Sequence, residues 1–589
     1  MKKTTLLLLL LTLCVYSGKS QATLNTSKSI EGFKSIPQEE VYVHYNTSLL
    51  FTGEYLYYKL YCLDTQTNNR SSISKMGYVE MVDGAGKQVF KHKVRLENGF
   101  GQGDFFLPPS VVSGNYKLLG YTQWMTNGEK DHFFHEDISV VNPYQENQDV
   151  ILAITGDETN GANETNQIAL ASNVTSKILS IELPSNSYGK RGLVALKLNG
   201  LKGASSYGDY SVSVRKLAQI GNVSSKMNAV AYKGLYKNRR TQNNLGGKRI
   251  ALPELRGELI SGQVTSNGAP ATNVDVAFSV PGHDYLFKVT NTNSEGLFYI
   301  NLSKEYDQLN AYAQVLNATP ANYEIQFIES PSVGISDVAF HSFKISKAEK
   351  EAILERSIYN QVENGYFTVK TDNVQTAPPI EPFYGTASRV YNLDDFTRFP
   401  TLRETLVEVV DNAWVKNTGG GNAVFQVRPQ DFSSNINALP LVMVDGVIVQ
   451  DHNDLVDDTA GKYKEISILK DQYFLGSQVF QGVIDMKTVK GNFHDTYYKS
   501  YLRSVSLFKA QPQKDYFNPV YSLDTASETK RIPDFRDQLL WMPSLKLNSD
   551  MEVIDFYTSD NLGTYEINIQ GFTANGTPVS VTETFVVRE

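Results

Sequence analysis

The chain has 589 residues and a formal net charge of −8, from 63 acidic and 55 basic side chains. A single hydrophobic core stops growing at roughly 250 to 300 residues, so this length predicts several domains. The charge is mild and no long basic or acidic block occurs, which argues against nucleic acid as a partner.

The first twenty residues form the pattern of an export signal. Lys2 and Lys3 precede a short apolar run and then small residues, which predicts a secretory signal peptide over residues 1–20, with cleavage before Gln21. Acylation of Cys14 is the alternative, although the residue before it departs from the usual lipoprotein pattern. No later apolar stretch reaches the roughly 18 residues of a membrane-spanning helix. We therefore expect an exported protein that meets the membrane only through a partner or a lipid.

The next two segments read as β-sandwiches. The chain holds 34 Tyr and 29 Phe, and residues such as Tyr55, Tyr57 and Tyr61 alternate with others in short runs bounded by turns, which is typical of strands. Residues 21–142, with the turn 83–86, resemble a macroglobulin-type sandwich of Bacteroidota surface and periplasmic proteins. Residues 167–220 resemble a second such domain, after a polar segment at 142–166.

A third sandwich and a helix follow. Residues 254–345, with alternating runs at 259–264 and 294–300, resemble a carboxypeptidase-regulatory-like domain, which has no activity of its own. Residues 346–377 are predicted to form a helix and a linker. Ser346 and Glu349 stand at capping-box spacing, which predicts that the helix begins there. Ile353, Leu354 and Ile358 line one side of this helix. The proline-rich segment 378–382 predicts a stiff connector.

Residues 384–491 contain three ordered motifs, at 440–447, 465–471 and 482–488. Asp445-Gly446 between apolar runs predicts a two-residue hairpin turn that continues into Val447. A helix is expected within 391–410, with caps at Asn392 or in the pair 394–395 and an apolar face that includes Leu402. The set resembles the plug domain of TonB-dependent outer-membrane receptors. About 100 residues follow, too few for a receptor barrel, whose strands need about 9 to 11 residues each. A generic small α+β domain is the alternative.

Strand-like runs in residues 492–589 predict a C-terminal immunoglobulin-like sandwich. The expected fold class is therefore mainly β: tandem immunoglobulin-like or macroglobulin-type sandwiches with one small α+β plug-like domain.

Motifs for catalysis are missing from the sequence. Cys62 is followed by Leu-Asp-Thr, so the thioester sequence of protease-trapping macroglobulins does not occur, and no Gly-x-Ser-x-Gly elbow is found. After signal cleavage Cys62 is also the sole cysteine, which excludes an internal disulfide. We expect no enzyme and assign no catalytic residue.

Two groups of side chains are candidate metal ligands. His132 and His135 could bind zinc on a helix, but their surroundings favour a strand, where i and i+3 face opposite sides. The carboxylates of 451, 454, 457 and 458 could hold calcium or could be solvated charges at a helix start. We assign no metal and no other cofactor.

Two short sequences, at 458–460 and 524–526, resemble the Asp-Thr-small sequon for O-glycosylation in Bacteroidota. They make Thr459 and Thr525 the candidate sites, although turn chemistry explains both segments equally well.

The function expected from this organisation is that of a non-enzymatic periplasmic binding protein associated with the outer membrane. The plug-like domain would dock on, or seal, a β-barrel provided by another chain, through the hairpin residues Asp445, Gly446 and Val447. The resemblance implies an outer-membrane barrel or a translocon, such as the type IX secretion channel, as the partner. The alternative is a surface-exposed accessory protein that captures ligands for a TonB-dependent nutrient receptor.

Overall fold

The computed structural model describes residues 33, 35–128, 133–153, 176–217, 220–236, 250–317, 319–329, 333, 338–430, 438–521 and 531–589. The predicted signal peptide, Cys14, His132 and Thr525 lie outside these residues. The chain divides into two compact units. Unit 1 comprises residues 1–35, 258–329 and 377–509, and unit 2 comprises residues 36–257, 330–376 and 510–589. No helix in the described ranges is both long and apolar enough to cross a membrane.

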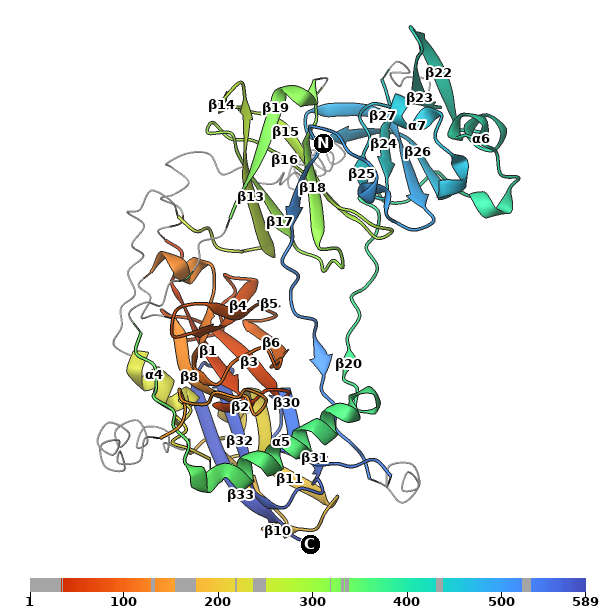
Figure 1. The fold of residues 1–589 in the computed structure, drawn as a ribbon. Helices are drawn as coiled ribbons and strands as arrows, with labels where there is room; N and C mark the ends of the chain where they lie inside the picture. The colour runs from red at the N-terminus through yellow and green to blue at the C-terminus, as the bar shows by residue number, and fades with distance from the viewer. Residues whose placement is uncertain are drawn as a thin grey trace, which may run out of the picture. The chain divides into compact units, whose positions relative to one another are not determined.

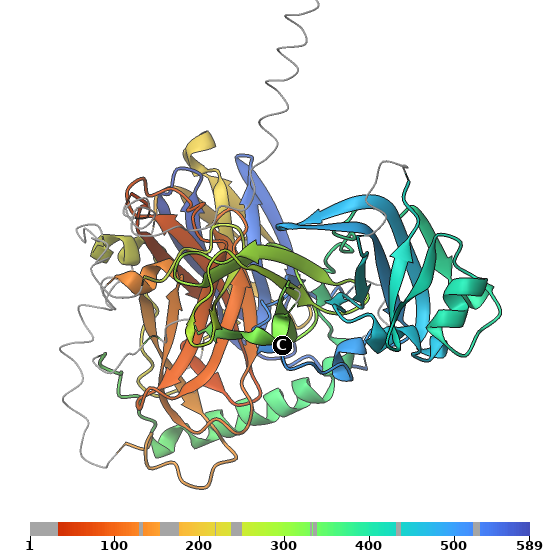
Figure 2. The same cartoon turned by 90° about the horizontal axis from the view of Figure 1, so that it is seen from above.

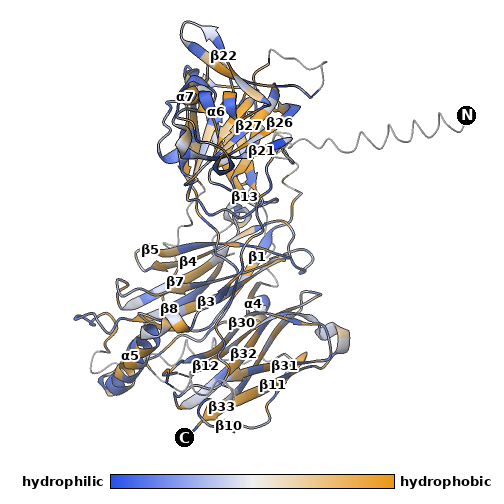
Figure 3. Ribbon diagram, turned by 90° about the vertical axis from the view of Figure 1, so that its right-hand side faces the viewer, coloured by the Kyte–Doolittle hydropathy of each residue, from blue (hydrophilic) through white to orange (hydrophobic). Residues whose placement is uncertain are grey.

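The protein is mainly β, as the sequence predicts, and most strand pairs in both units are antiparallel (Figure 1). Figure 3 shows hydrophobic residues concentrated on the strands. Alternation along a strand places every second side chain on the inner face of a sandwich, which explains why aromatic and branched residues recur at period two.

The first sandwich of unit 2 packs a three-stranded sheet against a five-stranded sheet. The first sheet has the order β1(Glu39–Tyr45), β3(Tyr55–Asp64), β6(Phe100–Phe106). The second has the order β2(Leu49–Phe51), β8(Phe134–Val141), β7(Gly114–Tyr121), β4(Met76–Asp83), β5(Gln88–Arg95). Fully buried side chains such as Val41, Leu60, Leu118 and Ile138 fill the space between them.

The second sandwich of unit 2 joins strands from distant parts of the chain. One sheet has the order β10(Ser187–Tyr188), β33(Pro578–Val587), β32(Gly563–Thr573), β12(Gly208–Lys216), β30(Gln538–Leu547). The other has the order β31(Met551–Tyr557), β11(Leu193–Gly200), β9(Leu179–Glu182).

This arrangement corrects the predicted domains 167–220 and 492–589, which are not separate sandwiches. Strand β12 lies between β30 and β32, with Val212 opposite both Met542 and Ile569. The described part of 167–220 supplies four strands, β9 to β12, and the fully buried Val194 and Leu196 need a second layer to cover them. The C-terminal strands complete both sheets, because four short strands cannot bury their apolar faces alone.

Helical segments of unit 2 are short except for α5(Lys350–Gly365), which runs alongside the sheets of this unit (Figures 1 and 2). The turn η5(Lys347–Glu349) opens it, and the Glu349 carboxylate accepts a hydrogen bond from the backbone of Ser346 at 2.6 Å, which confirms the capping box. The predicted apolar side is packed only in part: Ile353 packs against an apolar cluster, but Leu354 and Ile358 are about half exposed, whereas Arg356 is buried.

The other short elements of unit 2 are η1(Trp124–Asn127), η3(Gly203–Ser206), α4(Ala229–Tyr236), η6(Phe367–Val369), and the paired strands β20(Asn373–Val374) and β29(Lys514–Asp515).

The sandwich of unit 1 has one sheet built around β13(Glu258–Ser266), with β14(Ala269–Pro270), β17(Leu297–Leu302) and β19(Tyr323–Ile328). The other has the order β16(Leu286–Asn291), β15(Asp275–Val280), β18(Asn310–Val315), β28(Arg503–Ser506). The turn η4(Pro320–Asn322) precedes β19. Because β28 pairs with β18, residues up to Lys509 belong to unit 1, and the predicted C-terminal boundary at residue 492 is wrong.

The α+β part of unit 1 contains a mixed sheet in the order β21(Arg389–Asn392), β26(Tyr463–Leu475), β27(Gln478–Thr488), β24(Leu441–Val444), β25(Val447–Ile448). The hairpin β22(Ala413–Gly419) and β23(Asn422–Val427) stands beside α6(Leu402–Glu408). Short turns complete it: η7(Leu393–Asp395), α7(Asn453–Val456), η8(Ala460–Lys462) and η9(Phe493–Asp495).

Helix α6 begins later than predicted. Its cap is Thr401, which with Glu404 forms a reciprocal capping box at 3.3 Å in each direction, rather than Asn392 or the pair 394–395. The expected apolar face is correct, since Leu402 and Leu406 are buried.

Candidate functional site

The strongest candidate site is a cavity of about 380 Å³ inside unit 2, where α5 and the segment after it approach strands β3 and β30. Side chains from five stretches of chain line it, at positions 54–57, 215, 356–374, 514–517 and 535–541. A volume in this range matches ordinary small-molecule sites, which also combine apolar walls with a few polar groups.

One wall of the cavity is aromatic. Tyr55 and Tyr57 point to the same face of β3 because they are two residues apart, and their rings stack with centroids 5.7 Å apart. Trp541 on β30 continues the stack 6.0 Å from Tyr57, and Tyr516 meets Tyr57 edge-on at 5.0 Å. Such contacts fix ring orientations and give the cavity a preformed apolar surface.

The opposite side carries charges that are paired with one another. Arg356 of α5 donates two hydrogen bonds to the Glu54 carboxylate, from Nε to Oε1 at 2.7 Å and from Nη2 to Oε2 at 2.8 Å. Nη2 of Arg215 lies 3.0 Å from the same Oε2. Burial alone would raise the pKa of the Glu54 carboxyl, but the two guanidinium groups outweigh it and hold that pKa below its ordinary value. Glu54 is therefore ionised and locks α5 onto the first sandwich.

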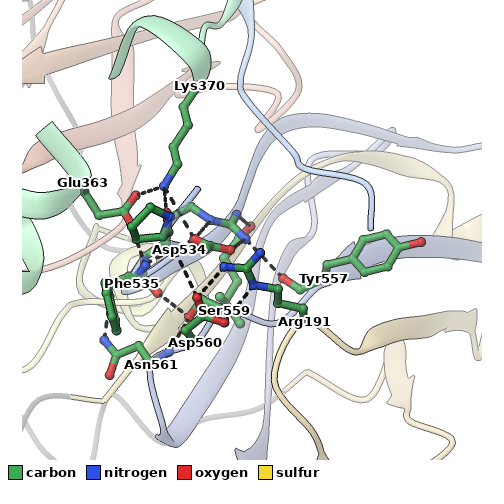
Figure 4. A network of polar contacts seen from close by, with 12 residues as sticks. Arg191, Glu363, Lys370, Asp534, Phe535, Tyr557, Ser559, Asp560 and Asn561 are labelled. Carbon is green, nitrogen blue, oxygen red and sulfur yellow. Dashed lines mark hydrogen bonds and ion pairs between the residues drawn. The ribbon is translucent and has the colours of Figure 1, made fainter. Parts of the chain in front are cut away.

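A second charge network fixes the cavity edge near η6 (Figure 4). The Asp534 carboxylate accepts two hydrogen bonds from Arg536, at 2.7 and 2.8 Å, and one from the Tyr521 hydroxyl at 2.7 Å. Lys370 donates to Glu363 of α5 at 2.6 Å and lies 3.9 Å from Asp534. Desolvation would raise the pKa of Asp534, yet the charge of Arg536 keeps it lowered.

In contrast to these carboxylates and cations, the aromatic wall holds unused hydrogen-bond donors. Trp541 is 4% exposed, and its Nε1 finds no hydrogen-bond partner among the described residues. Within the same ranges, no hydrogen bond involves the hydroxyl of Tyr57. The Trp541 nitrogen is itself shielded from solvent, so the Tyr57 hydroxyl is the donor of this wall that an incoming oxygen acceptor could meet.

The predicted hairpin of the plug-like segment exists. A two-residue turn joins β24 to β25, with positive φ at Asp445 (45°) and Gly446 (85°), which confirms the turn assignment. The Asp445 carboxylate accepts hydrogen bonds from the backbone N–H of Thr488 at 2.8 Å and from the Thr488 hydroxyl at 2.5 Å. It also accepts one from the backbone N–H of Phe493 at 3.0 Å. This aspartate ties β24 to the end of β27.

The structure buries that hairpin, which corrects the expectation that it faces a partner. Asp445 and Val447 are fully buried, and a Cβ on Gly446 would lie 2.5 Å from the Tyr285 side chain of the unit 1 sandwich. The cause is packing inside unit 1, where β24 contributes Leu441 to an apolar cluster shared with that sandwich. The hairpin is therefore a packing element inside unit 1.

The remaining candidates have local partners. Asp454, Asp457 and Asp458 pair with Lys499, Arg403 and Lys462, respectively. The described ranges contain no cluster of three or more potential metal ligands. His135 lies on strand β8, where its ring nitrogen contacts the carbonyl of Phe133 at 3.1 Å, and Thr459 is exposed.

Sequence reasoning missed the cavity. The alternating Tyr55 and Tyr57 were visible as a strand signal, but their neighbour Trp541 lies in a distant part of the sequence. Arg356 gave no clear signal, because its side of α5 also carries the polar Asn360 and Asn364, which donate hydrogen bonds to the carbonyls of Thr52 and Gly53.

Comparisons with known proteins give no family assignment. No protein-family model matches the sequence, and no curated protein matches it. Among solved structures, the Escherichia coli alpha-2-macroglobulin activated by porcine elastase aligns with 93% of this chain at 8% identity and a TM-score of 0.23. The chain spans 44% of the length of that protein.

Two further structures are similar at this level. Salmonella alpha-2-macroglobulin reacted with methylamine aligns at 11% identity over 93% of this chain and 23% of its own, with a TM-score of 0.15. A tetra-tandem repeat from the extending region of a large adhesion protein aligns at 8% identity over 94% of this chain and 100% of its own, with a TM-score of 0.13. These scores are too low to carry an argument about this protein.

Proposed function

We propose that the protein is a non-enzymatic binding protein of the bacterial cell envelope that captures a ligand in the cavity of unit 2. The observation that carries the proposal is the aromatic wall of Tyr55, Tyr57 and Trp541, whose stacked rings line the cavity. The charges around it are mutually paired, so the cavity lining offers no nucleophile next to a free base, which a hydrolytic site would require. A rigid apolar wall beside a few polar groups is suited to binding rather than reaction.

The test follows the indole proton of Trp541 by NMR during addition of pools of envelope-derived oligosaccharides and peptides. The chain has three tryptophans, so Trp541→Phe assigns the resonance by its disappearance. We expect one pool to shift this resonance and to leave those of Trp124 and Trp414 in place. If no pool shifts it, ligand capture by this cavity is refuted.

The second candidate function is docking of unit 1 on an outer-membrane β-barrel of another chain, in the periplasm, with the type IX secretion translocon as the most specific version. It is favoured by apolar side chains left exposed on the α+β part: Val390 at 57%, Val407 at 68% and Trp414 at 37%. Strand β21, which carries Val390, is the edge of its sheet and can accept a further strand.

Docking is tested by affinity capture from solubilised outer membrane, with a tag at Glu589. Val390→Lys with Val407→Lys should abolish recovery of a barrel protein, whereas Met551→Lys, an exposed apolar residue of unit 2, should not. If the docked unit also seals a pore, cells that carry the double variant should become sensitive to vancomycin. Equal barrel recovery by all variants would exclude this surface.

A further inference from the structure

Unit 2 holds a second cavity, of about 670 Å³. Residues of β3 and β6 from the first sandwich, of β12 and β30 from the second, and of the segment around β29 line it. A cavity of this size can hold a small organic ligand. Its lining contains four cations against three carboxylates, so its charges do not cancel.

Two of the four cations have carboxylate partners and two do not. Lys59 is in direct contact with Asp209, and Lys514 lies 2.8 Å from a carboxylate outside the lining. Arg70 and Lys546 form no ion pair with any residue that the structure describes. A cation that lines a cavity without a counter-charge is available to an anionic group of a ligand.

The two unpaired cations belong to one end of the cavity, where three cations surround a single carboxylate. Asp209 on β12 and Lys546 on β30 are direct partners in the strand register, and Lys59 reaches Asp209 from β3. Lys59 Nζ and Arg70 Cζ each lie 4.8 Å from the centre of the Phe100 ring. Asp209 can balance one of these three charges, so this end of the cavity is positive.

The proton affinity of Lys59 reflects the crowding of positive charge. Burial lowers the pKa of Lys59 to about 8, and the adjacent Asp209 opposes this shift. The charges of Arg70 and Lys546 lower it further. Neighbouring cations disfavour one another's charged form, and an anion bound among them would relieve that repulsion.

The other two carboxylates of the lining do not compensate this end. Glu97 and Asp515 are exposed, and neither lies within ion-pair distance of any cation in the described part of the chain. Water and salt screen exposed charges that are not in contact. The positive end of the cavity therefore keeps its excess.

Uncharged amides supply further polar groups. Six amide side chains line the cavity: Asn98, Gln102, Gln375, Gln513, Asn518 and Asn548. Gln102 is the register partner of Lys59, and Asn548 lies two positions from Lys546, so some of these amides lie close to the positive end. Each amide carries both donors and an acceptor and can bond to hydroxyl groups in either direction.

We propose that the second cavity binds an anionic sugar, with its carboxylate or phosphate group between Arg70 and Lys546 and its hydroxyls on the neighbouring amides. The planar guanidinium of Arg70 matches both kinds of anionic group, and Lys546 adds a second charge. This site is independent of ligand capture by the first cavity, because Arg70 and Lys546 line only the second one.

The test is calorimetric titration of the full protein with matched probes: galacturonate against galactose, glucose 6-phosphate against glucose, and inorganic phosphate alone. Calorimetry is needed because Trp541 lines both cavities, so its resonance would respond to a ligand in either one. An anionic sugar should bind at least about tenfold more tightly than its neutral counterpart, and added salt should weaken it.

Substitutions locate the site. Arg70→Met and Lys546→Met should each weaken the anionic sugar about tenfold, because a hydrogen bond to a charged group is lost. Arg70→Lys should weaken it less than Arg70→Met, since lysine keeps the charge but not the planar fork. Lys87→Met is the control: Lys87 is exposed in the turn before β5 of the same unit and lines neither cavity. Urea unfolding checks that each variant is folded.

Binding of either anionic sugar that is lost in both methionine variants and kept in the control supports the site, and the tighter sugar identifies the anionic group. Equal affinity for anionic and neutral sugars, no binding of any anionic probe, or unchanged affinity in Arg70→Met and Lys546→Met would overturn it. Inorganic phosphate that binds as tightly as glucose 6-phosphate would overturn the role of the amides. None of these results bears on ligand capture by the first cavity, which has its own test.

Discussion

Replacing Arg356 with Met should detach α5 from the first sandwich of unit 2. The Arg356 side chain is 8% exposed and donates twice to Glu54, at 2.7 and 2.8 Å, and once to the carbonyl of Leu49 at 3.1 Å. Removing one partner of a buried ion pair costs about 3 to 5 kcal/mol. Arg215 remains 3.0 Å from Glu54 and partly compensates its charge, so we expect the lower end, about 3 kcal/mol.

Lys197→Met provides the matched control. Lys197 pairs with Glu182 at 3.0 Å, but the two side chains are 42% and 58% exposed. Water screens such a pair, so its loss should cost much less stability than the loss of the buried pair. Two ion pairs of similar length in one unit thus differ mainly in burial.

The assay is urea unfolding followed by tryptophan fluorescence in a Trp414→Phe background. The remaining tryptophans, Trp124 and Trp541, both belong to unit 2, so the signal reports on that unit. A loss of stability in Arg356→Met as small as that in the control would refute the reasoning.

The same pair also predicts a pH dependence. The pKa of Glu54 is lower in the folded state than its ordinary value of 4.5, so its contribution is complete above that pH and is lost as the pH falls through the lower folded value. The difference between Arg356→Met and the unmodified protein should therefore be full at pH 7 and shrink below about pH 4.

Three predictions concern unit 1. Burial raises the pKa of Asp485 from 3.8 to about 6. The contribution of Asp485 to the free energy of unfolding is therefore complete below about pH 4 and falls by about 3 kcal/mol as the pH rises through 6. In Asp485→Asn, the urea unfolding midpoint should change less over this pH range than in the unmodified protein. Gly446→Ala should destabilise more than Gly420→Ala, since both have positive φ but only the first meets Tyr285, and equal unfolding midpoints would contradict this. Thr401→Ala should cost about 1 kcal/mol and increase hydrogen exchange in α6, and unchanged exchange would show that the cap is dispensable.

Local features of the structure followed from the sequence because their physical causes lie within a few residues. The turn at Asp445 and Gly446 needs two residues that tolerate positive φ, and the start of α5 needs Ser346 and Glu349 three positions apart. Thr401 and Glu404 carry the same capping-box signal for α6. The alternation of residues around Tyr57 likewise marks a strand without knowledge of its neighbours.

The tertiary structure alone decided which strands pair and which faces are covered. Strand β12 lies between β30 and β32, although more than 300 residues separate them, because apolar strands of similar pattern compete for one core. Loop-closure entropy grows only slowly with separation, so distance along the chain does not select among these partners. The same long-range pairing places Trp541 beside Tyr57 and turns Arg356 inward toward Glu54. The cavity exists only where these remote segments meet.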